Sequence, residues 1–131
     1  MHSAKDFDEL IVDAGAIYFV DGVPLLVRND AGLLPSLKFM NVTDSLPRVV
    51  VDMGAVARIA NGADVMRPGV RAVRRDFVKG DLVVIADEKY DKPIALGLAD
   101  VDSAELNSIS KGKVIRNVHY VGDEFWNAFG K

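Results

Sequence analysis

Residues 49–70 read VVVDMGAVARIANGADVMRPGV, and this segment carries the clearest structural signals in the chain. The valine run predicts a short buried strand. Asp52 is well placed to cap a helix that begins at Met53, because its carboxylate can accept the free N–H groups of the first turn. We expect that helix to end at Asn61 and Gly62, since glycine adopts the left-handed conformation that closes many helices. The segment therefore predicts a strand, a short helix and an exposed loop in close succession.

The loop after this helix is expected to carry polar and basic groups. Arg58 and Asn61 are three residues apart, so they share one side of the helix and point toward the following loop. Val65 and Met66 predict a short strand fragment. A turn over 67–69 follows, because proline fixes φ and glycine tolerates conformations that are closed to other residues.

N-terminal to this segment, the sequence predicts a β-hairpin. Two apolar, β-rich runs at 16–20 and 23–27 are separated by Asp21-Gly22, a pair that favours a type I′ turn. Pro24 has no N–H to donate, so we expect its strand to lie at a sheet edge, or Pro24 itself to lie at a non-pairing position.

The C-terminal part of the chain alternates short strands with turns. Asp102, with Glu105 three residues later, resembles a capping box for a short helix. Asp123 is expected to cap a last helix. Apolar runs bounded by turn residues predict strands in this region. The expected strands cover residues 82–86, 94–99 and 114–121.

Residues 41–47 are rich in turn-forming residues and predict a linker. We therefore place a domain boundary there, with a small N-terminal unit over residues 1–46 and a second domain over residues 47–131. Many short strands separated by turns predict a mainly β fold with short helices, of the α+β class. The expected architecture is a small mixed barrel preceded by a unit that contains a β-hairpin.

The composition limits the kind of protein that this chain can be. It has 131 residues, half of them apolar, which is enough to bury one well-formed core. It has no cysteine, which removes disulfide scaffolds, thiolate zinc sites and thiol nucleophiles. No apolar stretch approaches the ~20 residues of a membrane-spanning helix, and the acidic N-terminus has no signal-peptide pattern. We therefore expect a cytoplasmic protein without membrane contact.

The sequence offers no catalytic constellation. Neither a Walker pattern nor G-x-G-x-x-G is present. His119 is the only internal imidazole, and a lone histidine on a strand is more often structural than a general base. The two histidines, His2 and His119, lie too far apart in the sequence to suggest a metal site. We therefore expect no enzyme activity, no catalytic residue, no metal and no cofactor.

Basic residues concentrate in the middle of an otherwise acidic chain. The formal net charge is −3, yet residues 58–79 hold six basic side chains against two acidic ones. Such a run forms either a solvated charged face or a local stripe that binds a polyanion, and the charge alone leaves both open. The six basic residues are Arg58, Arg67, Arg71, Arg74, Arg75 and Lys79.

The segment at 49–70 closely resembles the opening strand, helix and loop of a PUA domain, the RNA-binding module of pseudouridine synthases and archaeosine transglycosylases. Two further matches lie at later strands, Lys79-Gly80-Asp81 and Pro93–Gly97. The resemblance implies a PUA-type pseudo-barrel of short strands with short helices. The strand pattern alone predicts a small mixed barrel, and the resemblance assigns this barrel to a family.

The two ends of the chain narrow the resemblance to one subfamily. The ending Asn117–Trp126 and the Asp-Gly hairpin followed by residues 34–38 look like archaeal stand-alone PUA proteins. That subfamily is related to the eukaryotic malignant T-cell-amplified protein, which acts with density-regulated protein on the small ribosomal subunit. The resemblance begins at about Leu10. The chain departs from the subfamily pattern at its start, where the relatives usually have a longer N-terminal domain with a basic stretch.

The resemblance also implies an RNA-binding surface, formed by the first helix of the PUA domain, the following loop and strand, and part of the last strand. There, arginines can contact phosphates and glycine lets the RNA backbone approach, while His119 or Tyr120 is expected to stack on an unpaired base. Each position also has a structural alternative: Gly62 ends the helix, Pro68-Gly69 turns the chain, and Tyr120 belongs to the core. The implied RNA-binding residues are Arg58, Asn61, Gly62, Ala63, Arg67, Pro68, Gly69, Arg116, Asn117 and His119.

These observations predict a non-catalytic RNA-binding protein that acts in translation or RNA modification and docks structured RNA, either tRNA or rRNA. The ribosome or a translation factor is an expected partner. The basic cluster Arg71, Arg74, Arg75 and Lys79 is expected to extend the path of the RNA phosphates. An alternative is a protein-interaction adaptor that recruits a translation factor through its N-terminal unit.

Overall fold

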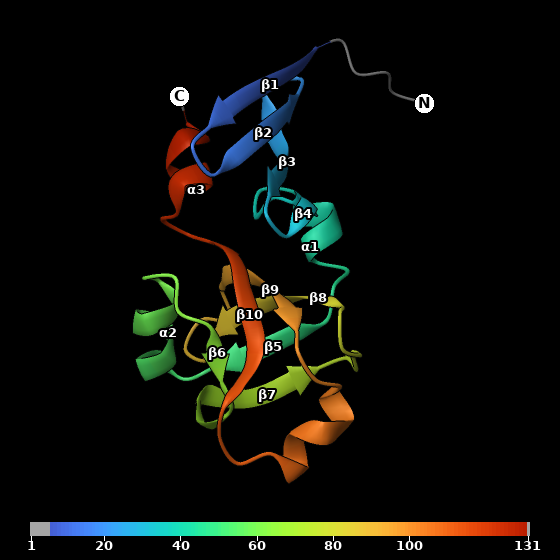
Figure 1. The fold of residues 1–131 in the computed structure, drawn as a ribbon, viewed down its shortest axis with the longest axis vertical. Coiled ribbons are helices and arrows are strands. Elements are labelled where there is room, and N and C mark those ends of the chain that lie inside the picture. Colours follow the sequence, from blue (N-terminus) through green and yellow to red (C-terminus); the bar gives the residue numbers. More distant parts are fainter. Residues whose placement is uncertain (1–5, 131) are drawn as a thin grey trace.

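In the computed structural model, which describes residues 6–130, two β-sheets follow one another along the long axis of the molecule (Figure 1). The N-terminal sheet is antiparallel throughout, with strand order β1-β2-β3-β4. The sequence predicted only its central hairpin. Its strands are β1 (Phe7–Val12), β2 (Gly15–Val20), β3 (Val23–Asn29) and β4 (Gly32–Pro35).

The hairpin between β2 and β3 confirms the predicted turn. Asp21 and Gly22 have φ values of 51° and 81°, the left-handed pair that a type I′ turn requires. Of the two alternatives expected for Pro24, an edge strand or a non-pairing position, the edge strand is wrong, because β3 lies between β2 and β4. The ladder skips Leu25 instead, so Pro24 lies beside a β-bulge, where a missing N–H is tolerated.

The second sheet has strand order β6-β10-β9-β8-β5-β7. Strands β5 and β8 are parallel, and the other pairs are antiparallel. The two edge strands, β6 and β7, are consecutive in the chain and are joined by a single 3₁₀ turn, η1 (Arg67–Gly69), as expected of a pseudo-barrel. The strands are β5 (Arg48–Val51), β6 (Val65–Met66), β7 (Val70–Arg74), β8 (Leu82–Asp87), β9 (Pro93–Ala99) and β10 (Lys113–Tyr120).

Short helices connect and close the strands. Helix α2 (Met53–Ile59) begins at the predicted cap, and the capping box of Asp102 and Glu105 holds the 3₁₀ helix η2 (Ser103–Ser108). Helix α1 (Met40–Thr43) overlaps the start of the segment that the sequence predicted as a linker. Helix α3 (Glu124–Ala128) is the last helix of the described chain. The fold is therefore mainly β with short helices, as predicted.

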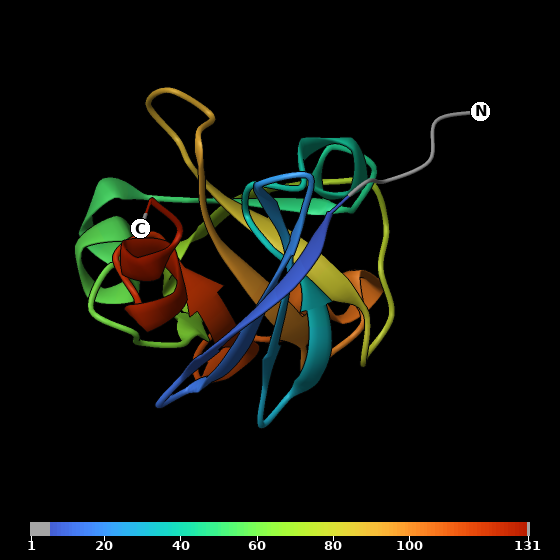
Figure 2. The same cartoon turned by 90° about the horizontal axis from the view of Figure 1, so that it is seen from above.

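Two apolar clusters hold the molecule together. One fills the barrel, around β5, β8, β9 and β10. The other lies between the barrel and the N-terminal sheet, where Phe125 of α3 and the following Phe129 pack with Ile17, Val27 and barrel residue Leu96. Seen from above, the N-terminal strands cross over the barrel and α3 lies beside them (Figure 2). The C-terminal helix thus packs with the N-terminal sheet, and the division at residues 46 and 47 remains a proposal.

Candidate nucleic-acid interface

The candidate interface is built around the C-terminal end of α2. Asp52 caps the first turn, since its Oδ1 accepts the Ala55 N–H at 2.7 Å. At the other end, Gly62 N–H donates to Ile59 O and Ala63 N–H donates to Arg58 O, which together form a Schellman motif. Gly62 has a φ of +92°, a conformation that an L-residue rarely adopts. The helix and its closing turn follow the pattern that the sequence predicted.

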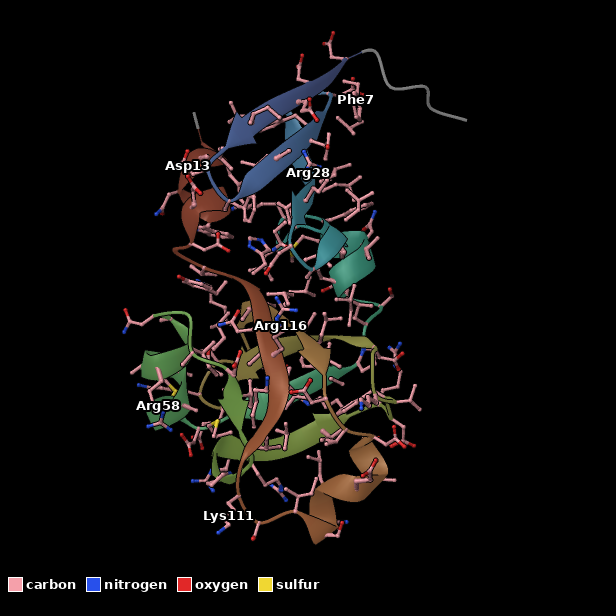
Figure 3. All side chains as sticks on the ribbon, viewed as in Figure 1. Phe7, Asp13, Arg28, Arg58, Lys111 and Arg116 are labelled. Carbon is pink, nitrogen blue, oxygen red and sulfur yellow. The ribbon has the colours of Figure 1, made fainter. Side chains whose placement is uncertain are left out.

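The closing turn lies at the surface of the protein. Asn61, Gly62 and Ala63 are all exposed, so their backbone can be approached from solvent. Arg58, on the last turn of α2, is also exposed and makes no ion pair with any residue of the described part of the chain. Figure 3 shows its side chain on the outside of the molecule. A free guanidinium therefore lies beside exposed backbone without large side chains, an arrangement that can bind an anionic chain.

Strand β10 supports this turn from behind. Asn117 Nδ2 donates to Ile59 O at 3.2 Å and to Ala63 O at 3.1 Å, and Asn117 N–H donates to Asp64 Oδ1 at 2.9 Å. A Cβ added to Gly62 would lie 3.3 Å from the Tyr120 hydroxyl, so the tyrosine packs directly against the turn. Asn117 and Tyr120 therefore position the turn.

Asp64 supports the candidate turn, and the sequence did not predict this role. In the sequence, Asp64 is one of two acidic residues that reduce the net charge of the basic run. The structure uses it to hold β10 against the loop that leads into β6. The sequence offered one signal for this role, an acidic residue within a mainly basic segment.

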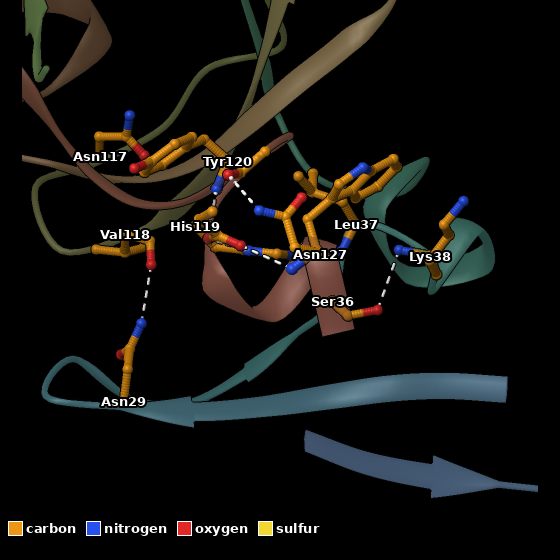
Figure 4. Close-up of polar contacts among 12 residues, drawn as sticks. Asn29, Ser36, Leu37, Lys38, Asn117, Val118, His119, Tyr120 and Asn127 are labelled. Atoms are coloured by element: carbon orange, nitrogen blue, oxygen red, sulfur yellow. Dashed lines mark hydrogen bonds and ion pairs between the residues drawn. The ribbon is translucent and has the colours of Figure 1, made fainter. Parts of the chain in front are cut away.

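His119 does not lie at the surface. Its side chain is completely buried, with Nδ1–H donating to Asp123 Oδ2 at 2.7 Å and Nε2 accepting the Leu37 N–H at 3.2 Å (Figure 4). Its ring also makes edge-on contacts with Phe125 and Phe129. This burial overturns the expected role of His119 in stacking on RNA. The histidine instead joins β10 to the N-terminal unit and to α3.

The turn η1 contains one exposed residue, one half-buried residue and one buried glycine. Pro68 is exposed, whereas Gly69 is buried. A Cβ added to Gly69 would lie 2.9 Å from Ala55 Cβ, so this glycine allows η1 to pack closely against α2. Arg67 is half-buried, and its Nε–H donates to Leu106 O of η2 at 2.8 Å. Arg67 therefore turns toward η2.

The expected extension through Arg71, Arg74, Arg75 and Lys79 is not a continuous track. Arg74 pairs with Asp91, and Arg75 donates to Ser45 O, so both are occupied at the C-terminal end of β7. Arg71 lies at the other end of β7, with Nη2 3.5 Å from Asp52 Oδ2. Because neighbouring residues of a strand point to opposite faces, a basic run in sequence is divided in space.

Arg116 lies between the two sheets. Its Nη2 is 3.0 Å from Asp30 Oδ2 in the loop between β3 and β4, so its charge is partly neutralised. Figure 3 places it near the middle of the molecule, between the barrel and the N-terminal sheet. It is half-buried, and it contributes a weaker field to the candidate surface than Arg58 does.

The described residues offer no site for a metal. Across residues 6–130, no three His, Cys, Asp or Glu side chains are arranged to hold an ion. None of the helices in that part of the chain is long and apolar enough to cross a membrane.

Comparison with known proteins places these features in a family. The model of the PUA domain matches residues 47–121. The uncharacterized protein MJ1432 of Methanocaldococcus jannaschii is 41% identical over 123 residues, which cover 92% of this chain and 75% of that protein. Translation machinery-associated protein 20 of Saccharomyces cerevisiae is 34% identical over 118 residues, which cover 85% of this chain and 65% of that protein.

Comparison with solved structures supports the same family. The crystal structure of a PUA domain from Aeropyrum pernix K1, a tartrate complex, has a TM-score of 0.83 at 31% identity and covers 98% of this chain and 78% of that chain. This chain therefore spans about three quarters of its archaeal relatives and just under two thirds of the yeast relative. The chain belongs to the PUA domain family, and it is similar to archaeal stand-alone PUA proteins and to the translation machinery-associated protein 20 family.

Proposed function

We propose that this protein is a non-catalytic RNA-binding protein that acts in translation or RNA modification and docks structured RNA, either tRNA or rRNA. The observation that carries this proposal is the exposed, unpaired Arg58 beside the exposed turn at Gly62, held in place by Asn117 and Tyr120. Membership of the PUA family supports it, because PUA domains typically bind RNA. The name of the yeast relative connects that relative with the translation machinery.

The chemistry of the turn suits a sugar-phosphate chain. A guanidinium group can make two parallel, charge-assisted hydrogen bonds to a phosphate. A turn without large side chains lets the RNA backbone approach protein N–H groups closely. Because the turn is held by hydrogen bonds from β10, little conformational entropy is lost when RNA binds.

The interface should engage few phosphates, because the whole chain is acidic and several arginines are already paired. For three to five contacts, the logarithm of the RNA affinity should fall with the logarithm of salt concentration with a slope of about −2 to −4.5. Titrations of a fluorescently labelled tRNA transcript and an rRNA fragment at several salt concentrations measure this slope. Specificity for structured RNA is checked against a single-stranded oligonucleotide of the same length.

Substitution of Arg58 tests the site. Arg58→Gln should weaken RNA binding by about tenfold or more, because a charge-assisted contact is lost. Arg58→Glu should weaken it further. The matched control is Arg74→Gln, which removes an exposed arginine of the same basic run that already pairs with Asp91. Equal RNA affinities of the Arg58 variants and the wild type, with the fold intact by circular dichroism, would discard the site.

One observation favours the alternative of an interaction adaptor. Phe7, Ile11 and Leu33 are 65%, 64% and 60% exposed and lie on the same outer face of the N-terminal sheet. The edges of that sheet are β1 and β4, so an adaptor surface would lie there and not at Pro24. Capture of partners from lysate with and without ribonuclease separates the two functions. A single protein captured in a ribonuclease-resistant manner would favour the adaptor.

A further inference from the structure

A polar hollow of about 280 Å³ lies between β7 and η2, and of the residues that the family resemblance assigns to RNA only Arg67 lines it. It opens where the edge strand β7 passes η2. Two guanidinium groups line it, together with one carboxylate, one hydroxyl and one amide. These lining residues are Arg67, Arg71, Asp76, Ser103 and Asn107, with Leu106 at the wall.

One hydrogen bond fixes the orientation of the Arg67 side chain in this hollow. Its Nε–H donates to the carbonyl of the buried Leu106 at 2.8 Å, which fixes the plane of the guanidinium group. Its terminal N–H groups have no hydrogen-bond partner within residues 6–130. Arginine carries five N–H donors, so this anchoring leaves a directed fork of donors free.

The other lining groups keep donors available as well. Arg71 is 56% exposed, and its one ion pair, with Asp52 at 3.5 Å, is long. The exposed Asn107 side chain forms no hydrogen bond in the part of the chain that the structure describes. Asp76 opposes the arginines, but its Oδ1 lies 3.5 Å from Ser103 Oγ, and the lining side chains retain an excess of one positive charge.

We infer that this hollow binds a phosphate oxyanion, held by Arg67, Arg71 and Asn107. Guanidinium and amide donors on a concave, positively charged surface are the chemistry that recognises phosphate. Arg67 joins the hollow to the candidate interface across η1. A phosphate of bound RNA is therefore one source, in which case the inference rests on the proposed function, and free phosphate is the other.

The RNA arm of the test uses the full chain and a labelled tRNA transcript. Arg71→Gln should weaken binding and reduce the magnitude of the salt slope by about 0.7 to 0.9, the effect of one phosphate contact. Arg74→Gln, which removes the arginine at the other end of β7, should leave both unchanged. Asn107→Asp is a second variant that adds a repelling carboxylate without breaking any described hydrogen bond, and it should also weaken binding.

The phosphate arm uses inorganic phosphate and needs no RNA. Amide NMR signals of Arg67, Arg71, Ser103 and Asn107 should shift on titration with phosphate but not with the same ionic strength of chloride, and the shifts should be lost in Arg71→Gln. A response in this arm with unchanged RNA affinity identifies free phosphate as the source. A response in the RNA arm identifies a phosphate of RNA.

The outcomes separate the two proposals. If Arg58→Gln weakens RNA binding while Arg71→Gln and phosphate titration have no effect, the proposed function stands and the hollow has no anion-binding role. If the wild type does not bind RNA, the proposed function fails, and the phosphate titration alone decides the hollow. The inference is overturned if neither the RNA arm nor the phosphate arm gives a response.

Discussion

His119 is buried beneath the N-terminal unit, and its two ring nitrogens have different partners. Nδ1–H donates to Asp123, and Nε2 accepts the N–H of Leu37. His119→Phe should destabilise the protein by about 1 to 3 kcal/mol, because the buried Leu37 N–H loses its acceptor, whereas Asp123 Oδ2 still accepts the Tyr120 N–H. Chemical denaturation measures the loss. Tyr90→Ala, at a side chain that is 72% exposed, is the control and should change stability by less than about 0.5 kcal/mol.

Local sequence patterns could not predict that His119 is buried and holds α3 and the N-terminal unit together. The cap at Asp123 was correctly predicted from its position before a helix. The same carboxylate holds His119 only because α3 packs back against the N-terminal sheet, and residues far apart in sequence create that contact. A histidine in a strand has the same local sequence pattern whether its side chain is buried or exposed.

Gly62 adopts a left-handed backbone conformation and also packs against Tyr120. Gly80 has the same backbone conformation without such a neighbour, so it separates the two effects. Gly62 and Gly80 have φ values of +92° and +93°, but only Gly62 has a side chain, that of Tyr120, within 4 Å of an added Cβ. Gly80→Ala should cost about 1 to 2 kcal/mol for the left-handed backbone alone. Gly62→Ala should cost more and should also weaken RNA binding. Equal losses of stability would show that Tyr120 yields freely, and equal RNA affinities would remove the turn from the interface.

At the scale of elements, Asp91 connects β5 and β7 through Arg48 and Arg74. Burial raises the pKa of the Asp91 carboxyl, but hydrogen bonds and charge from the two arginines outweigh it and hold the pKa below the ordinary value of 3.8. Because the pKa is lowered in the folded state, the stabilisation is present above pH 3.8 and is lost as the pH falls through the lower, folded-state value. The carboxyl is 38% exposed, so the effect should stay below about 1 kcal/mol.

Asp91→Asn tests this pH dependence. The wild type should be more stable than the variant at neutral pH, and the difference should shrink in acid as the carboxyl is protonated. Denaturant midpoints of both proteins measured between neutral and strongly acidic pH give the comparison. A difference that grows toward low pH would contradict the lowered pKa.

Elements with a buried face or a capping residue were predictable, and the others were not. Helix α2 and the hairpin between β2 and β3 carry local signals at Asp52 and Asp21-Gly22 that need no tertiary context. Strand β1 is almost entirely exposed, so it has no buried face to produce an alternating pattern. Strand β7 contains arginines, so its sequence resembles a run of charged residues and not a strand. The candidate turn was therefore predictable, whereas the distribution of the basic groups depended on the path of β7.

At the scale of the whole molecule, β10 connects the candidate interface with the N-terminal unit. Asn117 and Tyr120 hold the turn at Gly62, while the carbonyl of Val118 accepts the Asn29 side-chain N–H at 2.8 Å. A register irregularity between Asn117 and His119 lets neighbouring side chains serve the two sides. One strand therefore carries contacts to both parts of the molecule.

This connection predicts that the two sheets unfold together. Phe125 of α3 is 3% exposed and belongs to the apolar cluster that joins the N-terminal sheet to the barrel. Phe125→Ala should cost about 3 to 5 kcal/mol, because it leaves a cavity in that cluster. In the wild type, fluorescence of Trp126 and far-ultraviolet circular dichroism should report one coincident thermal transition. Val78→Ala, at a side chain that is 57% exposed, is the control and should leave the transition nearly unchanged. Two separate transitions in the wild type would mean that residues 1–46 fold independently of the barrel, since a shared cluster must be lost as one unit.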